Sequence, residues 1–293
     1  MDHTLPLVSI AMPVFNAART LPATLCSIRL QTYQHWELLL IDDGSSDATL
    51  GLAHAAARAD SRIRVIEGVG NAGLAARLNE AIALARGPYI ARLDADDIAY
   101  PTRLAIQLKF MLDNPECDLL GCAALIFDDS GRMRGKWSAP QVHAEICARP
   151  WSRIPLPHPT WFGKRQWFAR YEYRPEYKKT QDQDLLLRAY ADSRFACVPD
   201  ILLGYRQERR SLGKLLAGRR NFSRSIVREA WRQGAFAAGL GGLGGQVGKA
   251  VLDVLTVPFG WDRLLRGESA TGLATDEEQA WRSVWKAVSS GSN

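Results

Sequence analysis

Four short apolar segments in the first hundred residues are each followed by polar side chains and then by a helical pattern. Strands that are apolar along their whole length are typical of a parallel sheet whose two faces are covered by helices. The alternation therefore predicts an α/β fold with a Rossmann-like, mostly parallel sheet flanked by helices. The strands are expected at residues 7–12, 37–41, 63–66 and 89–93, and the helices at 17–31, 47–59, 74–85 and from Pro101 onward.

Polar residues lie directly after each predicted strand. The carboxyl ends of parallel strands meet at one edge of a sheet, where open α/β folds bind their ligands. Groups able to hold a ribose, a base or a metal-bound phosphate are therefore expected to gather at that edge. In chain order they are Asn16, Asp42 and Asp43, Asn71, and Asp94, Asp96 and Asp97.

The last of these positions carries three carboxylates within four residues, Asp94, Asp96 and Asp97. Ionised carboxylates this close together repel one another, which favours a cation among them. Their hard oxygen atoms suit Mg²⁺ or Mn²⁺, ions that usually reach a protein together with the phosphates of a substrate. A solvated acidic turn is the alternative interpretation.

Residues 68–73 match the G-x-G-x-x-G pattern of dinucleotide-binding folds, but their position argues against that interpretation. The fingerprint belongs to the first strand–helix turn of its domain, whereas here two strand–helix units come before it. Asp42 and Asp43 are also already placed to contact a nucleoside. Gly70 and Gly73 are therefore expected to allow a tight turn near phosphate.

These motifs, in their order and spacing, resemble the family 2 glycosyltransferases, which have the GT-A fold, use nucleotide sugars and invert the anomeric centre. The similarity covers roughly residues 6–210. The segments that carry it are residues 8–16, 40–47, 71–79, 93–97, 101–104, 158–160 and 181–185.

The resemblance implies which residues bind the nucleotide sugar. The loop after the first strand contacts the nucleotide, and Asp43 accepts a hydrogen bond from the uracil imide. Arg77 would lie near the phosphates or the base, with an exposed helix charge as the alternative. The expected nucleotide-sugar-binding residues are Pro13, Val14, Asn16, Asp42, Asp43, Asn71, Gly73, Arg77, Asp94 and Ala95.

The resemblance also implies a metal site, because residues 94–96 match the family's D-x-D motif. Asp96 would hold the divalent cation, Mn²⁺ or Mg²⁺, that bridges the two phosphates, and Asp94 would contact the ribose or the same cation. Such a cation neutralises the charge that grows as the nucleoside diphosphate leaves. Asp97 is expected to brace the loop.

Asp182 matches the catalytic aspartate of the family, which acts as a general base on the attacking acceptor hydroxyl. Gln181 stands where the family usually has Glu. Asp184 is the alternative base, although its usual role is to cap the following helix. His158 is a candidate metal or phosphate contact, or else a packed structural residue, and Arg206 is a candidate contact of the diphosphate.

The net charge of +6 is concentrated in one region. Residues 204–234 hold nine Arg or Lys against two Glu, so this segment carries +7 and the rest of the chain −1. On a helix, arginines every four residues form a stripe that either covers a surface helix or rests on anionic lipid headgroups. Phe222, Ile226 and Ala230 would face the other way. The stripe consists of Arg220, Arg224, Arg228 and Arg232.

The patterns divide the chain into a GT-A catalytic domain over residues 1–212 and a basic helical extension over residues 213–293. Residues 1–130 form the nucleotide-sugar half of the domain, and residues 131–212 form the acceptor half.

Five scattered cysteines favour a reducing compartment. The N-terminus lacks a signal-peptide pattern and no stretch offers about 18 uninterrupted apolar residues, so a cytoplasmic location, peripheral at the inner face of the plasma membrane, is expected.

The expected function is metal-dependent, inverting transfer of a sugar from a UDP-type donor to a glycan or lipid-linked acceptor in bacterial cell-envelope or exopolysaccharide synthesis. A nucleotidyltransferase is the enzymatic alternative, but it needs a Gly-rich loop with Lys or Arg after the first strand, where residues 13–16 read Pro-Val-Phe-Asn. A catalytically inactive sugar-nucleotide-binding or scaffold protein is the other alternative, for which Gln181 is the only hint. No nucleic-acid partner is expected, because no recognised fold or stacking motif accompanies the basic charge.

Overall fold

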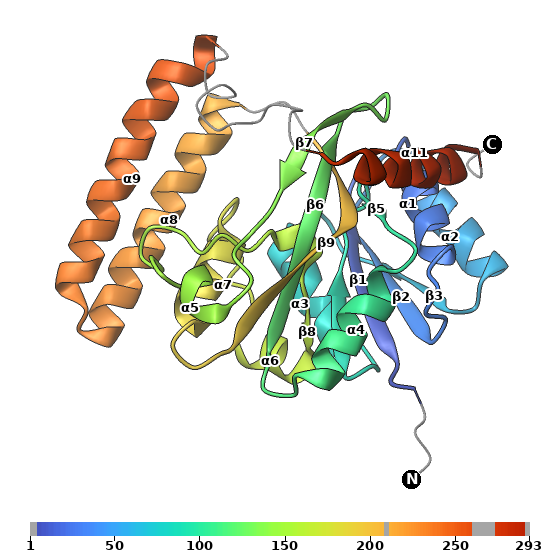
Figure 1. Ribbon diagram of the computed structural model, residues 1–293, viewed down its shortest axis with the longest axis horizontal. Helices are drawn as coiled ribbons and strands as arrows, with labels where there is room; N and C mark the ends of the chain where they lie inside the picture. The colour runs from blue at the N-terminus through green and yellow to red at the C-terminus, as the bar shows by residue number, and fades with distance from the viewer. Residues whose placement is uncertain (1–4, 208–210, 260–272, 291–293) are drawn as a thin grey trace.

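The computed structural model describes residues 5–207, 211–259 and 273–290, built around one central sheet (Figure 1). The strands are β1 (Val8–Val14), β2 (Trp36–Asp42), β3 (Ile63–Glu67), β4 (Tyr89–Arg92), β5 (Ile98–Ala99), β6 (Leu119–Phe127), β7 (Met133–Trp137), β8 (Phe162–Lys164) and β9 (Phe195–Arg206). They are ordered β3-β2-β1-β4-β8-β6-β9-β5, and β7 pairs with β6.

Helices flank the sheet and continue beyond it. Those of the first half are α1 (Leu21–Arg29), α2 (Thr49–Ala59), α3 (Leu74–Leu84) and α4 (Arg103–Asp113). Those of the second half are α5 (His143–Ile146), η1 (His158–Thr160), α6 (Arg165–Arg170), α7 (Gln181–Ala189), α8 (Leu212–Gln233), α9 (Phe236–Thr256), η2 (Val257–Phe259) and α11 (Thr275–Ser290).

The first half is the predicted parallel sheet. β1 pairs in parallel with β2 and β4, and β2 pairs in parallel with β3. Alternate residues of β2 enter two different cores: Leu38 and Leu40 pack with α1, α2 and α4, whereas Leu39 and Ile41 pack with α3, α6 and α7. The strands are apolar throughout because both of their faces are covered, which confirms the α/β prediction.

The second half makes the sheet mixed. β8 pairs antiparallel with both β4 and β6, while β9 runs parallel to β6 and antiparallel to β5. In this arrangement the carboxyl ends of β6 and β9 lie at the same edge of the sheet as the carboxyl ends of β1 and β4 (Figure 1). Residues far apart in the sequence therefore meet at that edge.

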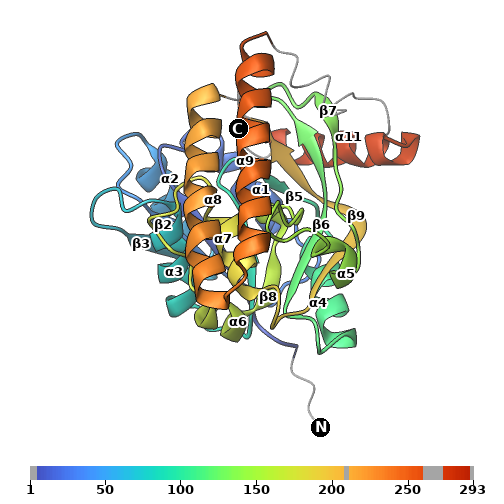
Figure 2. The ribbon, with the colours of Figure 1, turned by 90° about the vertical axis from the view of Figure 1, so that its left-hand side faces the viewer.

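The C-terminal extension consists of two parts that lie against different elements. α8 and α9 form a helical hairpin beside α7 (Figures 1 and 2), and Phe222 and Ile226 of α8 pack on Leu187 of α7. α11 returns to the first half, where Trp281 packs on Phe127 and Tyr100. Within the described ranges, no helix is both long enough and apolar enough to cross a membrane.

Candidate functional site

A cavity of about 820 Å³ lies at the carboxyl ends of β1 and β4. Asn16 follows β1, Asp94 and Asp96 follow β4, and Arg206 ends β9, so segments from three strands contribute to one wall. Pro13 and Ala95 line it as well. We call this space the carboxylate cavity.

The three aspartates after β4 divide into two roles. One carboxylate oxygen from each of the three aspartates lies within 4.8 Å of those of the other two. Asp97 is fully buried and its Oδ1 accepts a hydrogen bond of 2.9 Å from the backbone N–H of Arg206, so it braces β9 as expected. Burial and the charges of Asp96 and Asp94 raise the pKa of the Asp97 carboxyl. Asp94 and Asp96 line the cavity, and their oxygen atoms fit Mg²⁺ or Mn²⁺.

Asp43 and Arg77 hold the loop between β3 and α3. The Asp43 carboxylate accepts hydrogen bonds from the backbone N–H groups of Ala72 and Gly73 at 2.8 and 2.9 Å, and from Arg77 Nε at 2.8 Å. Arg77 also donates to the carbonyl of Gly70 at 2.8 Å and its side chain is only 8% exposed. Arg77 is therefore neither the exposed helix charge of one interpretation nor a residue of the cavity wall.

The glycines of the G-x-G-x-x-G segment have steric roles in this loop. A Cβ atom on Gly68 would lie 2.1 Å from Cζ of Arg77, so a larger residue there would displace the guanidinium from its observed position. Gly70 and Gly73 have φ angles of +62° and +87°, a left-handed backbone conformation that favours glycine. These requirements account for the pattern without a dinucleotide.

The loop after β1 is fastened to the loop after β2. Asn16, at φ +49°, accepts a hydrogen bond of 2.9 Å from the backbone N–H of Ser46. Asp42 accepts from the backbone N–H groups of Gly44 and Ser45, both at 3.0 Å. Val14 is buried within β1, and Asn71 is exposed on the neighbouring loop. Of these residues Asn16 alone reaches the carboxylate cavity.

A second cavity of about 640 Å³ adjoins the first, and Lys179, Tyr205 and Lys214 line both. It contains Asp182, at the start of α7, and we call it the cationic cavity after the Arg and Lys side chains around it. Burial raises the pKa of the Asp182 carboxyl above its usual value, although hydrogen bonds from Gln183 oppose the shift. The pKa of Asp182 is therefore raised by burial, next to an uncharged Gln181.

Residues 9–172, more than half of the chain, match the family described as Glycosyl transferase family 2. The chain belongs to glycosyltransferase family 2. An Escherichia coli relative, the UDP-Glc:alpha-D-GlcNAc-diphosphoundecaprenol beta-1,3-glucosyltransferase WfgD, is 40% identical over 135 residues, which are 46% of this chain and 52% of WfgD. The chain thus spans about half the length of this curated relative.

Two solved structures share the fold of this chain along nearly its whole length. S. aureus TarS 1-349 in complex with UDP-GlcNAc matches with a TM-score of 0.61 and 17% identity over 99% of this chain and 82% of that one. The mannosyltransferase PcManGT from Pyrobaculum calidifontis, in complex with GDP-Man and Mn²⁺, matches with a TM-score of 0.61 and 16% identity over 99% and 86%. The predicted GT-A fold is confirmed.

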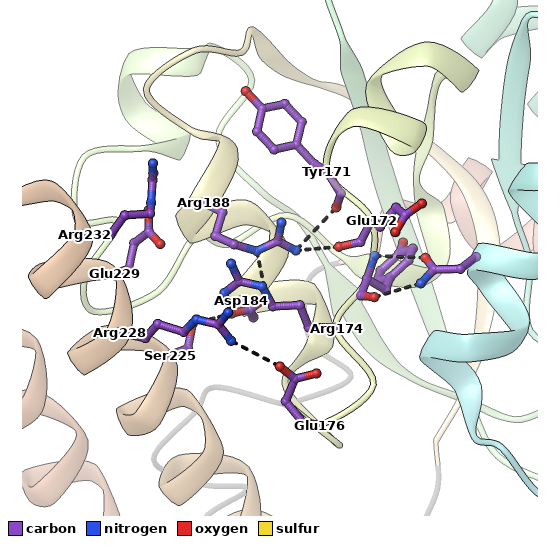
Figure 3. Close-up of polar contacts among 12 residues, drawn as sticks. Tyr171, Glu172, Arg174, Glu176, Asp184, Arg188, Ser225, Arg228, Glu229 and Arg232 are labelled. Carbon is purple, nitrogen blue, oxygen red and sulfur yellow. Dashed lines mark hydrogen bonds and ion pairs between the residues drawn. The ribbon is translucent and has the colours of Figure 1, made fainter.

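Asp184 lies away from both cavities, at the contact of α7 with α8 (Figure 3). Its carboxylate is fully buried and accepts hydrogen bonds from Arg188 at 2.9 Å, Arg174 at 3.4 Å and Ser225 of α8 at 2.6 Å. Asp184 is therefore engaged by two guanidinium groups and one hydroxyl group, whereas Asp182 lines the cationic cavity. The hydrogen bond of Asp184 with Ser225 connects the C-terminal hairpin to α7.

His158 belongs to a buried aromatic cluster. One ring nitrogen lies 2.9 Å from the Tyr173 hydroxyl, and the ring meets Trp161 edge-on at 4.5 Å. Burial and the charge of Arg92 hold the pKa of His158 well below its usual value, so the imidazole is neutral. The structure places His158 as the packed residue of the second interpretation.

Several residues of the cavity walls were not predicted. Lys179, with a φ angle of +69°, precedes Asp182 by three residues and lines both cavities. Asp129 accepts hydrogen bonds of 3.0 Å from both Arg19 and Arg206, which holds Arg206 at the cavity. The signals in the sequence for the basic cavity walls were the pair of lysines shortly before Asp182 and the basic segment at residues 204–234, which includes Lys214.

Proposed function

We propose that this chain transfers a sugar, with inversion, from a UDP-type nucleotide sugar to a hydroxyl group of a glycan or lipid-linked acceptor in bacterial cell-envelope or exopolysaccharide synthesis. The observation that carries the proposal is the adjacency of the two cavities. Asp94 and Asp96 line one, Asp182 lies in the other, and Lys179 and Tyr205 line both. A donor in the first cavity would thus present its sugar toward a base in the second.

In the proposed reaction the acceptor hydroxyl gives its proton to the Asp182 carboxylate as its oxygen bonds to the anomeric carbon. The bond from that carbon to the donor phosphate breaks, and the nucleoside diphosphate leaves with the electron pair. Asp94 and Asp96 would hold the Mn²⁺ or Mg²⁺ ion, which supplies positive charge to the leaving diphosphate. Lys179 and Arg206 line the same cavity and add positive charge.

The nucleotide would occupy the first half of the domain. Pro13 and Asn16, which line the carboxylate cavity, are proposed to contact the nucleoside, and the buried Val14 lies between them in the chain. Asp42, Asp43 and Arg77 keep the surrounding loops in place, and Asn71 and Gly73 lie on one of those loops. The UDP named for WfgD and the UDP-GlcNAc bound by TarS support a uridine base, and the Mn²⁺ bound by PcManGT supports a metal.

A panel of nucleotide sugars, each with and without Mn²⁺, tests this function. We expect selective thermal stabilisation by one UDP-sugar that depends on the metal, and slow release of UDP from it. Stabilisation without any turnover or acceptor-dependent release would favour the inactive sugar-nucleotide-binding alternative. Absence of both responses for every nucleotide sugar would contradict the proposal.

We further propose that the α8–α9 hairpin rests on an anionic membrane at the inner face of the plasma membrane. The predicted stripe faces outward on α8: Arg220, Arg224 and Arg228 are exposed, and Arg228 pairs with Glu176. Two further arginines of the basic segment at residues 204–234, Arg209 and Arg210, lie outside the described residues. The opposite face of α8 packs on α7. The helix can therefore both cover the surface of the domain and rest on anionic lipid headgroups.

Exposed apolar side chains next to this stripe favour the membrane as its partner. Trp231 of α8 is 79% exposed and meets Phe236 of α9 edge-on at 5.8 Å. Basic residues beside exposed aromatic and aliphatic groups are typical of helices that lie in a lipid interface. The exposed apolar residues of the hairpin include Val227, Trp231, Phe236, Leu240, Val247, Val251 and Leu255.

Sedimentation with lipid vesicles measures this contact. We expect binding to vesicles containing about one third phosphatidylglycerol and weak binding to pure phosphatidylcholine, because each basic residue near an anionic surface contributes about 1 kcal/mol. Trp231→Ser together with Leu240→Ser should reduce binding, whereas Leu112→Ser, an exposed leucine on α4, should not. Equal binding by all variants would rule out the hairpin as the contact.

A further inference from the structure

The cationic cavity carries more positive charge than a neutral sugar acceptor requires. Among the described residues that line it, five are Arg or Lys and two are Asp. Asp182 is the proposed base, and Asp253 accepts a hydrogen bond from Arg219. The basic residues are Arg153, Lys179, Lys214, Arg219 and Lys249.

These basic residues fall into two groups. Lys179 and Lys214 also line the carboxylate cavity, where the donor diphosphate would lie. Arg153, Arg219 and Lys249 belong to the cationic cavity and come from the segment after α5, from α8 and from α9. The second group is therefore placed for a different anion.

The second group places three cations in a cavity whose described lining holds one carboxylate besides the proposed base, Asp253. Lys249 donates to the Ser152 carbonyl at 3.0 Å and to the Ser152 hydroxyl at 2.9 Å, which are uncharged acceptors. Burial and the charges of Arg219 and Arg153 lower the pKa of Lys249. Like charges gathered in a half-buried space attract an anionic ligand, and Arg and Lys are the usual protein partners of phosphate.

Apolar side chains lie on the same walls as these charges. Leu215 and Phe222 of α8 and Leu252 of α9 line the cavity. Leu252 is 49% exposed, so the apolar wall continues onto the outer surface of α9. The cavity thus offers positive charge next to a path toward the exposed apolar face of the hairpin.

We propose that Arg153, Arg219 and Lys249 bind a phosphate or diphosphate group of the acceptor, and that this group links the acceptor sugar to a lipid. The inference rests on the proposed function and adds the chemical class of the acceptor. With its phosphate bound by these three basic residues, the acceptor would have its sugar next to Asp182. Its lipid chain would follow the apolar wall out to the membrane surface.

Calorimetric titration with farnesyl diphosphate, in the presence of saturating UDP and Mg²⁺, tests this site with a probe that carries no sugar. Occupied by UDP, the carboxylate cavity cannot account for the binding. We expect Lys249→Gln and Arg219→Gln each to weaken the binding at least about tenfold, because each removes a charged hydrogen-bond donor to phosphate. Farnesol, which lacks the diphosphate, should bind at least about tenfold more weakly than farnesyl diphosphate, for the same reason.

Three controls make the result specific. Arg58→Gln removes an exposed charge on α2 and should leave the titration unchanged. Lys249→Arg and Arg219→Lys keep the charge and should restore most of the affinity, which separates the charge from a packing defect near Asp253. UDP affinity should stay within about twofold in every variant, since these residues do not line the carboxylate cavity.

The proposal is overturned if farnesyl diphosphate binds all variants equally, if farnesol binds as tightly, or if UDP displaces farnesyl diphosphate. It is also overturned if a glucuronide glycoside binds in a Lys249-dependent manner while farnesyl diphosphate does not, because the ligand is then a carboxylate. Normal UDP binding in any of these cases leaves the proposed function intact. Loss of UDP binding by the wild type would instead refute the function itself.

Discussion

Asp182→Asn is expected to lower kcat for sugar transfer by about 10²- to 10⁴-fold, the usual contribution of a general base. The amide cannot accept the proton of the acceptor hydroxyl, but it has nearly the same shape as the carboxylate. UDP affinity and the melting temperature should therefore change little. Steady-state transfer assays and UDP titrations, together with thermal melts of the same preparation, measure the three quantities.

Asp184→Asn is the contrasting variant two residues away. It removes a charge that is fully buried between Arg174 and Arg188 and should destabilise the protein by about 3 kcal/mol. Asp192→Asn, at an exposed position near the end of α7, should affect neither stability nor turnover. Undiminished transfer by Asp182→Asn, with the acceptor saturating, would show that Asp182 is not the base.

The pH dependence of the wild type provides a second measure of the same residue. A general base acts in its ionised form, and burial raises the pKa of Asp182. Activity should therefore fall as the pH drops through a value above the ordinary aspartate pKa, rather than persist to that ordinary value. The acid limb of the kcat/KM profile should report this raised pKa.

The nucleotide-sugar half could be predicted from the sequence because its determinants are local. Each strand from β1 to β4 is a short apolar segment, and the polar residues that end it sit at the sheet edge by the geometry of parallel pairing. Asn16, Asp94 and Asp96 reach the carboxylate cavity for this reason. Their placement needs only the chain direction and the strand ends.

The partners of individual side chains could not be predicted in the same way. The ion pair between Asp43 and Arg77 was not predicted. The two side chains fasten the loop at residues 69–73, since a buried guanidinium must satisfy its donors wherever carbonyl and carboxylate oxygens are near. Which oxygens are near depends on Gly68, whose missing side chain admits the guanidinium. Sequence spacing carries no such information.

Long-range packing explains the remaining differences. The glycines of residues 239–248 would be expected to weaken a helix, yet α9 forms across them. A Cβ on Gly239 would lie 2.6 Å from Ala230 of α8, and one on Gly242 would lie 2.7 Å from the Trp151 carbonyl. These glycines permit close approach of α9 to its neighbours, so their purpose is visible only in the folded molecule.

Asp96→Asn is expected to lower transfer more than about 100-fold at a fixed, subsaturating Mn²⁺ concentration, and to raise the Mn²⁺ concentration needed for half-maximal activity. The substitution removes one anionic oxygen ligand from a site whose carboxylates can lie within 4.8 Å of one another. Loss of repulsion among the carboxylates should leave the apo protein as stable as the wild type or more so. Activity as a function of Mn²⁺, and the melting temperature in EDTA, measure these two effects.

Asp129→Asn is the matched control, since Asp129 lines the same cavity but lies outside the three-aspartate cluster and contacts Arg19 and Arg206. It should leave the Mn²⁺ midpoint unchanged even if it alters turnover through Arg206. Removal of the metal by EDTA should make wild type and Asp96→Asn equally inactive, because the difference between them depends on the bound cation. If wild-type transfer persists in EDTA, or if the midpoint for Mn²⁺ is the same in both proteins, Asp96 does not hold a catalytic cation.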